Sequence, residues 1–498
     1  MVNYTRKAVK GTSIVFVMAL ATAFLSYLWR VLLEGSLTKS DYGLVFALVA
    51  FFQIILVFKD LGLNSALTKY TAEFRTRKEF SKIKGSILLV FITQFLIGLF
   101  IGIIAIIFSD QIATIVFHDY ADTALVSLLI KLYAVAMILV PGAALMKSCF
   151  QGFQRMEYYS LVTFIRAFSL LFFTYIFLDN GLFVIAPILA YVLYYMLPPL
   201  IYFPIFIKKV FPDFFSVKAA VDKHLTKKLF RFGIPVILTG FGGVIFTTTD
   251  TAILTLFRPL SEVGLYNIGM PTSRILWKLS AALAVVLLPL SSELWASRSI
   301  DRIGKGMRIL YKYSFMLILP LSIVMFIFPE IILRIIFGSD SVAAANVIRI
   351  LSIGAVARVL GSANNTVLLG IGKPGEVSRI TLAGAGVNLI LNLILIPVYG
   401  MEGAAATTTL TFILMFLLAM RKLRESIDIR LPWRDFASIA IAGILVSAFI
   451  LMITALPFDI LTKLVISLLF GSVLYVLILL VLKTLSIEEV RKTARRIL

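Results

Sequence analysis

The chain has 498 residues, of which 60% are hydrophobic and only 15% are charged, and its mean hydropathy is +1.01. This composition excludes a soluble globular protein and predicts an all-α polytopic protein of a cell membrane. One cysteine, Cys149, and two distant histidines, His118 and His224, exclude a disulfide framework and a metal site built from these residues. In a soluble protein a net charge of +21 would suggest a nucleic-acid partner. In a membrane protein we expect the basic residues to determine how the chain is oriented in the membrane, and we expect no nucleic-acid partner.

The apolar runs, taken in chain order, predict fourteen membrane-spanning helices. They cover residues 12–33, 42–62, 84–108, 122–146, 159–178, 182–206, 232–255, 265–289, 309–329, 342–369, 379–398, 402–420, 436–456 and 460–482. The first run is too long for the core of a cleavable signal peptide, so we expect a retained helix. Lys and Arg gather in the joins on the side of the N-terminus, whereas the opposite joins hold only Lys39, Arg258, Arg334 and Lys463. The positive-inside rule then predicts that both chain ends are cytoplasmic.

The two halves of the chain resemble each other. Four pairs of landmarks recur in the same order at a spacing of about 220 residues, which indicates an internal repeat. The pairs are Gly11 with Gly233, Gly43 with Gly264, Phe108 with Phe328, and Gly152 with Gly370. Six spans separate equivalent points. Because six is an even number, the two halves share one orientation in the membrane, which predicts two lobes related by an axis along the membrane normal.

We therefore expect two parallel-related six-helix lobes followed by two further helices. The expected parts are the first lobe 1–206, a basic cytoplasmic linker 207–231, the second lobe 232–421, the last two helices 422–483 and a cytoplasmic tail 484–498. The tail "SIEEVRKTARRIL" combines a capping box with one apolar face, which predicts a basic amphipathic helix on the inner leaflet; a solvated tail is the alternative. The "GIGKPG" segment at 370–375 lacks the spacing and the preceding strand of a phosphate loop, so we interpret it as a turn.

Seven basic residues fall inside the predicted spans. They are Arg30, Lys131, Arg166, Arg274, Lys278, Arg349 and Arg358. Each intramembrane charge costs about 2.5–3.5 kcal/mol on insertion scales, so each is a candidate for function. Four of them lie within about two helical turns of a span end, where a long side chain can reach the interface, so a structural role is the alternative for those.

Arg274, Lys278 and Arg358 lie near the middle of their spans. In an α-helix Arg274 and Lys278, four residues apart, share one face and repel each other. Asp250 is the one clear intramembrane acid, so internal pairing does not neutralise these cations. The excess predicts a positive cavity for an anionic substrate. Pairing with helix C-terminal carbonyls and water is the competing interpretation.

Asp250 closes the "FTTTD" segment of the seventh span, and two interpretations of it stay open. It can pair with Arg30, which lies one residue from the repeat-equivalent position. Alternatively, Asp250 can hold a coupling cation together with the nearby threonine hydroxyls and the amides of Asn388 and Asn392. Those amides lie four residues apart on one helix face, and oxygen ligands suit a hard ion such as Na⁺.

At these residues the chain resembles the superfamily of multidrug, oligosaccharidyl-lipid and polysaccharide exporters. The resemblance rests on "KDLGLNSALTKY", "SEVGLYNIGMP", "FPEIILRIIFG" and "NLILNLILIPVYGMEGAAATT", and it is greatest to the Wzx-type polysaccharide flippases. It implies two lobes around a central cavity, alternating access and a polyprenyl-(pyro)phosphate-linked oligosaccharide as substrate. It also implies that Arg274, Lys278, Arg30 and Arg358 engage the phosphate groups, and that Asp250, Asn388 and Asn392 bind a coupling ion, Na⁺ or H⁺.

The leading hypothesis is therefore a flippase that moves the lipid-linked oligosaccharide to the outer leaflet for cell-surface glycan synthesis. Its expected partners are the substrate, membrane lipids and membrane proteins of glycan assembly, and we expect no cofactor. The alternative is an ion-coupled multidrug antiporter of the same fold, which depends on Asp250 instead of the cations. A membrane enzyme requires an acid or metal site on an outer loop or a soluble domain, and the short outer joins argue against that class.

Overall fold

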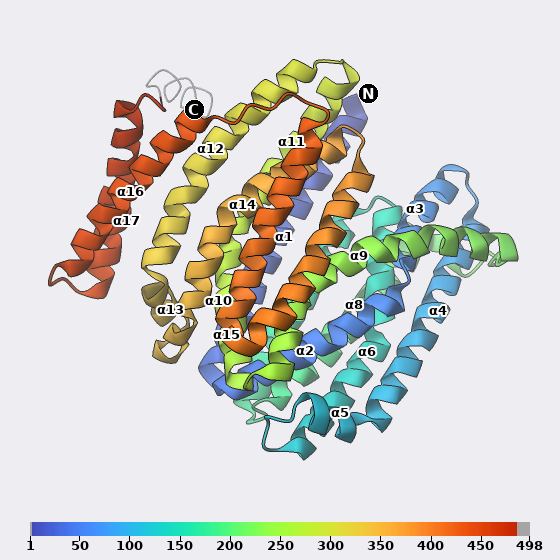
Figure 1. Cartoon of the computed structure of the whole chain (residues 1–498). Coiled ribbons are helices and arrows are strands. Elements are labelled where there is room, and N and C mark those ends of the chain that lie inside the picture. The colour runs from blue at the N-terminus through green and yellow to red at the C-terminus, as the bar shows by residue number, and fades with distance from the viewer. Residues whose placement is uncertain (1, 486–498) are drawn as a thin grey trace. The chain divides into compact units, whose positions relative to one another are not determined.

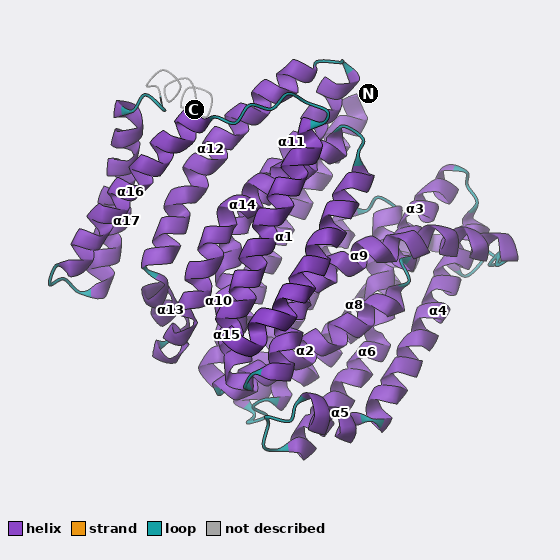
Figure 2. Cartoon of the chain, in the orientation of Figure 1, coloured by secondary structure: helices purple, strands orange, loops and turns teal. Residues whose placement is uncertain are grey.

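The computed structural model describes residues 2–485, and all regular structure in these residues is helical (Figure 2). The amphipathic helix predicted in the tail falls on residues 486–498, which lie outside the described residues. Contacts divide the chain into two compact units, the first ending at Gly264 and the second beginning at Leu265.

The first unit runs from α1 to the beginning of α10 (Figure 1). Its helices are α1 (Val2–Ser36), α2 (Lys39–Asp60), α3 (Leu63–Thr76), α4 (Phe80–Ile107), α5 (Ser109–Val116), α6 (Thr123–Gly152), α7 (Met156–Asp179), α8 (Ile185–Ile205), η1 (Phe206–Val210), η2 (Pro212–Phe214) and α9 (Lys223–Phe257). α10 (Leu260–Ser273) begins in this unit and continues into the second. Several helices begin directly after a polar N-cap residue. The side chain of Asp222, for example, accepts a hydrogen bond from the backbone N–H of Leu225 at 2.6 Å, which satisfies one orphan donor of α9.

The second unit contains the remaining helices. They are η3 (Arg274–Trp277), α11 (Lys278–Ala296), α12 (Ile300–Ile327), α13 (Pro329–Phe337), η4 (Ser339–Ala344), α14 (Ala345–Gly370), α15 (Pro374–Arg424), α16 (Trp433–Ala455) and α17 (Ile460–Val481). The 51-residue α15 covers the two predicted spans 379–398 and 402–420. Gly400 bends it, because φ 55° and ψ −132° interrupt the helical backbone in a region open to glycine.

Eleven helices of the described chain are long and apolar enough to cross a membrane. This confirms the prediction of an all-α multi-pass membrane protein. The bent α15 counts once in that number, and the apolar part of α9, Gly242–Phe257, is shorter than the limit for a span. The count of fourteen spans and the orientation of the chain ends stay predictions.

Repeat-equivalent glycines pack against each other where α2 meets the start of α10. A Cβ on Gly43 would lie 1.8 Å from the carbonyl oxygen of Leu260, and a Cβ on Gly264 would lie 2.4 Å from the carbonyl oxygen of Lys39. The repeat pairs Lys39 with Leu260 and Gly43 with Gly264, so the contact is reciprocal, as across a two-fold axis. The carboxylate of Asp119 fixes the same point by accepting the N–H of Leu260 at 2.8 Å.

The linker predicted at 207–231 packs back onto the first unit. Phe206, Phe211 and Phe214 are buried in one hydrophobic cluster with residues of α3, α4 and α6. The Nζ of Lys84 on α4 donates to the carbonyl of Val217 at 2.8 Å. The basic segment between the predicted lobes is therefore an ordered part of the first unit.

Candidate functional site

Arg30 lies on α1 among aromatic side chains of the first unit. Its guanidinium carbon is 4.2 Å from the centre of the Phe46 ring, within the range of a cation–π contact. The preceding Trp29 is buried and donates its indole N–H to the hydroxyl of Thr174 on α7 at 3.0 Å. This buried bond fixes α1 against α7 and with it the position of Arg30.

Arg166 on α7 belongs to the same aromatic region. Its guanidinium carbon lies 4.1 Å from the Tyr194 ring centre and 5.1 Å from that of Tyr195. The charges of Arg30 and Arg166 both act on the hydroxyl of Tyr191. We call these five residues the arginine–tyrosine cluster. Arg166 is not one of the predicted substrate-binding cations, although "YVLYY" places Tyr191, Tyr194 and Tyr195 on one helix face.

A cavity of about 170 Å³ lies between α1, α6 and α7, next to Arg166 along α7. Lys147, Tyr159, Ser160 and Thr163 contribute its polar lining, and the Nζ of Lys147 is 4.9 Å from the Tyr159 ring centre. Lys147 and Arg166 repel each other. Two like charges beside hydroxyl groups favour an anion in this part of the first unit.

Asp250 is 3% exposed on α9, and the neighbouring threonines Thr248, Thr249 and Thr251 are buried with it. The hydroxyl of Thr248 donates to the carbonyl of Val244 at 2.7 Å, which leaves its oxygen available as an acceptor or ligand. The structure thus places a buried carboxylate among hydroxyl groups in the first unit. Pairing with Arg30 and binding of a coupling ion both stay predictions.

Asn388 and Asn392 are fully buried on α15 in the second unit. The Nδ2 of Asn392 donates to the Oδ1 of Asn388 at 3.2 Å, so the two amides do share one helix face. The Nδ2 of Asn388 has no hydrogen-bond partner among the described residues. Since Asp250 belongs to the other unit, an ion site formed by all three residues stays a prediction. Within residues 2–485, no group of three or more His, Cys, Asp and Glu side chains is placed to hold a metal.

Arg274 and Lys278 do not share a face as an unbroken α-helix would require. A turn of 3₁₀-helix, Arg274–Trp277, separates α10 from α11. Four residues turn a 3₁₀-helix by about 120° beyond full rotations, compared with about 40° in an α-helix. Consistent with that rotation, Arg274 is partly buried whereas Lys278 is exposed.

Aromatic rings connect two of the predicted cations in the second unit. The guanidinium carbon of Arg274 is 5.8 Å from the Trp277 ring centre, and Trp277 meets the Phe412 ring edge-on at 5.0 Å. The guanidinium carbon of Arg358 is also 5.3 Å from the Phe412 ring centre. We call these four residues the guanidinium–aromatic row. A tryptophan three residues after an intramembrane arginine is the sequence signal for it.

Lys59 is a buried cation that the sequence analysis did not single out. It is 2% exposed at the end of α2, and its Nζ donates to the carbonyl of Met137 at 2.9 Å. Its neighbour Asp60 accepts from the amide of Gln94 at 2.9 Å and also from Asn64. These polar contacts join α2, α4 and α6 where α2 ends, which favours a structural role.

Arg349 also has structural partners. It forms an ion pair with Glu330, and its Nη1 donates to Asn346 at 3.0 Å. Its Nε donates to the carbonyl of Phe326 at 3.3 Å. These bonds tie α14 to α12 and α13, so the structural alternative explains Arg349.

A basic stripe marks the first turns of α9. It consists of His224, Lys227, Lys228 and Arg231, spaced on one helix face. With Tyr70 and Phe232 these side chains line a surface cavity of about 530 Å³, and Lys228 pairs with Glu73 at 3.0 Å. The stripe lies on the side that the positive-inside rule predicts to be cytoplasmic, where it suits phosphate groups.

Two family models match the chain. The model described as polysaccharide biosynthesis protein matches residues 8–295, more than half of the chain. The MatE model matches residues 235–394. The first match thus covers the arginine–tyrosine cluster, Asp250 and Arg274, while the second covers Asp250, Asn388 and Asn392.

Two relatives match the chain along nearly its whole length. A membrane protein of Methanocaldococcus jannaschii is 30% identical over 100% of this chain and 99% of its own length. The probable low-salt glycan biosynthesis flippase Agl15 of Haloferax volcanii is 25% identical, over 96% of each chain. Among solved structures, the lipid II flippase MurJ in an inward closed conformation aligns with a TM-score of 0.74 at 14% identity, over 94% of this chain and 98% of its own. At that identity the likeness concerns the fold.

Proposed function

The chain belongs to the polysaccharide biosynthesis protein family, and from that premise we propose that it moves a polyprenyl-(pyro)phosphate-linked oligosaccharide from the cytoplasmic to the outer leaflet. It is a multi-pass membrane protein of the exporter superfamily that contains the flippases, and it is not an enzyme. The probable glycan biosynthesis flippase among its relatives supports a lipid-linked glycan as substrate and cell-surface glycan synthesis as the setting.

The guanidinium–aromatic row is the observation that carries this proposal. Arg358 is partly buried inside a membrane-spanning helix, and it forms no ion pair with any carboxylate in the described part of the chain. A guanidinium that lies against an aromatic ring still has N–H groups free to donate to a phosphate. It binds the phosphate through two parallel hydrogen bonds. The row therefore favours the phosphate groups of the lipid-linked substrate.

The arginine–tyrosine cluster of the first unit supports the same substrate class. Arg166 lies against Tyr194 and Tyr195, and tyrosine combines a ring face with a hydroxyl. An oligosaccharide needs apolar ring faces for its C–H surfaces and hydroxyl partners for its own hydroxyl groups. We assign sugar contacts to the tyrosines and phosphate contacts to the arginines.

A flipping assay tests this proposal. The full-length protein is reconstituted in vesicles with a fluorescent polyprenyl-pyrophosphate oligosaccharide, and the arrival of label at the opposite leaflet is followed. Arg358→Gln is expected to slow flipping at least tenfold, and Arg358→Lys to recover part of the rate because the charge returns without the planar fork. Arg334→Gln, at an exposed cation on α13, is the control and should keep the wild-type rate. A wild-type rate in Arg358→Gln contradicts the assignment.

An ion-coupled multidrug antiporter is the second candidate function. The buried carboxylate of Asp250 and the MatE match over residues 235–394 favour it. In that case Asp250→Asn abolishes export of an organic cation while Arg358→Gln has little effect. For the flippase, coupling to Na⁺ or H⁺ through Asp250, Asn388 and Asn392 predicts that Asp250→Asn removes the response of flipping to an ion gradient. Equal flipping with and without a gradient in the wild type would argue against coupling.

A further inference from the structure

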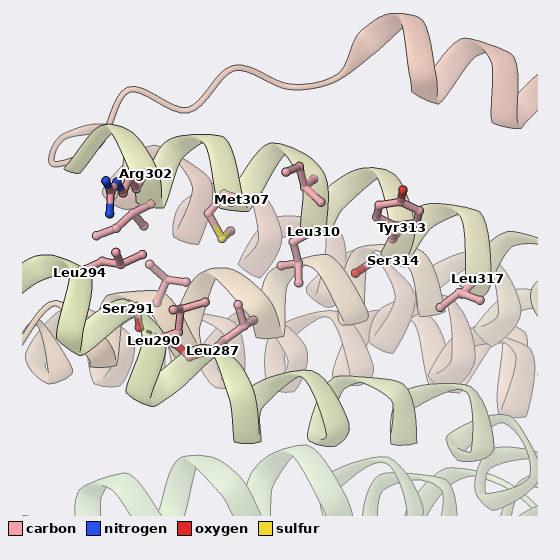
Figure 3. A pocket seen from close by; sticks show the side chains of 14 residues that line it. Leu287, Leu290, Ser291, Leu294, Arg302, Met307, Leu310, Tyr313, Ser314 and Leu317 are labelled. Atoms are coloured by element: carbon pink, nitrogen blue, oxygen red, sulfur yellow. Dashed lines mark hydrogen bonds between the residues drawn. The ribbon is translucent and has the colours of Figure 1, made fainter. Parts of the chain in front are cut away.

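An apolar groove of about 320 Å³ lies in the second unit between α11, α12 and α14 (Figure 3). Apolar side chains of α11 and α12 form most of its walls, and Figure 3 shows Arg302 at one end and Leu317 at the other. Leu290, Ile309 and Leu317 are 46%, 57% and 55% exposed, so the groove opens to the surface of the unit. In a membrane protein, an apolar opening of this kind suits a hydrocarbon chain.

The packing of α11 explains why the groove is open. A Cβ on Gly370 of α14 would lie 1.9 Å from the Oγ of Ser291, so α11 lies close against α14 at this level. On the α12 side, a Cβ on Gly306 would meet no atom within 4 Å. The absence of a side chain at Gly306 thus leaves space between α11 and α12 that no residue of the described chain fills.

Arg302 gives the groove one charged end. It lies in the first turn of α12, is exposed, and forms no ion pair with any described residue. Asp301, its neighbour, lines a different cavity, together with Lys305, Arg308 and Asp428. The positive-inside rule predicts that this end of α12 is cytoplasmic, which places the guanidinium at the level of lipid phosphates.

We propose that the groove binds one chain of an anionic membrane lipid of the cytoplasmic leaflet, with the lipid phosphate against Arg302. The apolar walls fit the chain, and the guanidinium fits the phosphate. The position along α11 favours a resident lipid over the transported one. Leu294, at the charged end, is about 24 Å along the helix from Lys278, at 1.5 Å per residue. A phosphate at Arg302 is therefore remote from Lys278, one of the cations predicted to hold the substrate, and this inference does not depend on the proposed function.

Photo-crosslinking of a lipid to the full-length protein tests the proposal. The protein is placed in vesicles containing a trace of phosphatidylglycerol or phosphatidylcholine with a photoreactive chain, and labelled peptides of α11 and α12 are quantified by mass spectrometry. The wild type is expected to label these peptides about fivefold more strongly with the anionic lipid, as one basic residue near the surface allows. Equal labelling by both lipids would overturn the proposal.

Two variants separate the chain site from the phosphate site. Gly306→Leu fills the groove and should lower labelling by either lipid about tenfold, whereas Gly386→Leu, at an exposed glycine with equal open space, should not. Arg302→Gln should keep chain labelling but lose the preference for the anionic lipid, and Arg308→Gln should retain it. Unchanged labelling in Gly306→Leu, or an unchanged preference in Arg302→Gln, contradicts the assignment. Displacement of the label by an equimolar amount of polyprenyl phosphate would overturn the choice of a resident lipid.

Discussion

A proline on α6 provides the acceptor that holds the buried Lys59. Pro141 has no N–H, so the carbonyl of Met137, four residues earlier, has no helical partner. The Nζ of Lys59 donates to that carbonyl at 2.9 Å. Gly98 of α4 makes room for it, since a Cβ there would lie 3.1 Å from the Lys59 side chain. Three helices thus combine to place one cation inside the first unit.

We expect Lys59→Met to lower the stability of the protein by about 1–3 kcal/mol, because the Met137 carbonyl then stays buried without a donor. The measurement is thermal unfolding of the purified chain. In a Pro141→Ala background the restored N–H satisfies the same carbonyl, so the cost of Lys59→Met should be smaller. Equal costs in both backgrounds would contradict this account of Lys59.

Sequence reasoning succeeds for residues whose helix is regular and fails where the backbone departs from it. The shared face of Asn388 and Asn392 follows from α-helical spacing, and the structure confirms it. The prediction that Arg274 and Lys278 share a helix face is wrong, because a turn of 3₁₀-helix lies between them. Within that turn Arg274 and Trp277 are three residues apart and therefore lie on the same side of the helix.

At the scale of elements, α2 and α10 meet through backbone instead of side chains. The carbonyl oxygen of Leu260 lies against the Cα of Gly43, and that of Lys39 lies against the Cα of Gly264. Each oxygen occupies space that the Cβ of any other residue would need. The repeat in the sequence pairs these glycines, but it does not say that they touch. Pairing two equivalent segments in space requires the tertiary structure.

We expect Gly43→Ala to destabilise the protein by about 1–3 kcal/mol, since its Cβ would lie 1.8 Å from the Leu260 carbonyl oxygen and the helices must separate. Thermal unfolding of purified protein measures this, with Gly386→Ala as a control at an open position. Gly264→Ala disturbs the same contact, so the double variant should cost less than the sum of the two singles. A melting temperature for Gly43→Ala equal to that of the control would contradict the contact.

Helix boundaries show what hydropathy detects and what it misses. The apolar runs predict most spans, because burial in a bilayer demands about 20 consecutive apolar residues. The amphipathic α3 (Leu63–Thr76) falls in a predicted join, and packing of its apolar face, including Leu67 and Phe74, explains why it is a helix. The non-helical backbone at Gly400 interrupts α15 between the predicted spans 379–398 and 402–420.

At the scale of the molecule, composition and hydropathy suffice to predict a helical multi-pass membrane protein, and the structure confirms it. The predicted orientation rests on the distribution of Lys and Arg alone. The candidate binding residues are harder to predict, since Arg166 and Phe412 gain significance only through neighbours on other helices. Such contacts depend on side-chain packing between helices, which has no simple period in the sequence.

Cysteine labelling tests the predicted orientation of the chain. The sole cysteine, Cys149, is buried and can be replaced by alanine. In that background, Ser216→Cys in the linker should react with a membrane-impermeant maleimide only after the cells are opened. Ser339→Cys, at the exposed start of η4 on the predicted outer side, should react in intact cells. The reverse pattern would place both chain ends outside.

The central claim is that cations inside the membrane-spanning helices select a phosphate-bearing lipid. The most direct measurement compares the flipping rates of two lipids that carry the same oligosaccharide, one through a pyrophosphate and one through a neutral ether. The wild type is predicted to flip the pyrophosphate lipid at least tenfold faster, and Arg358→Gln is predicted to lose most of that preference. Equal rates for the two lipids in the wild type would contradict the claim.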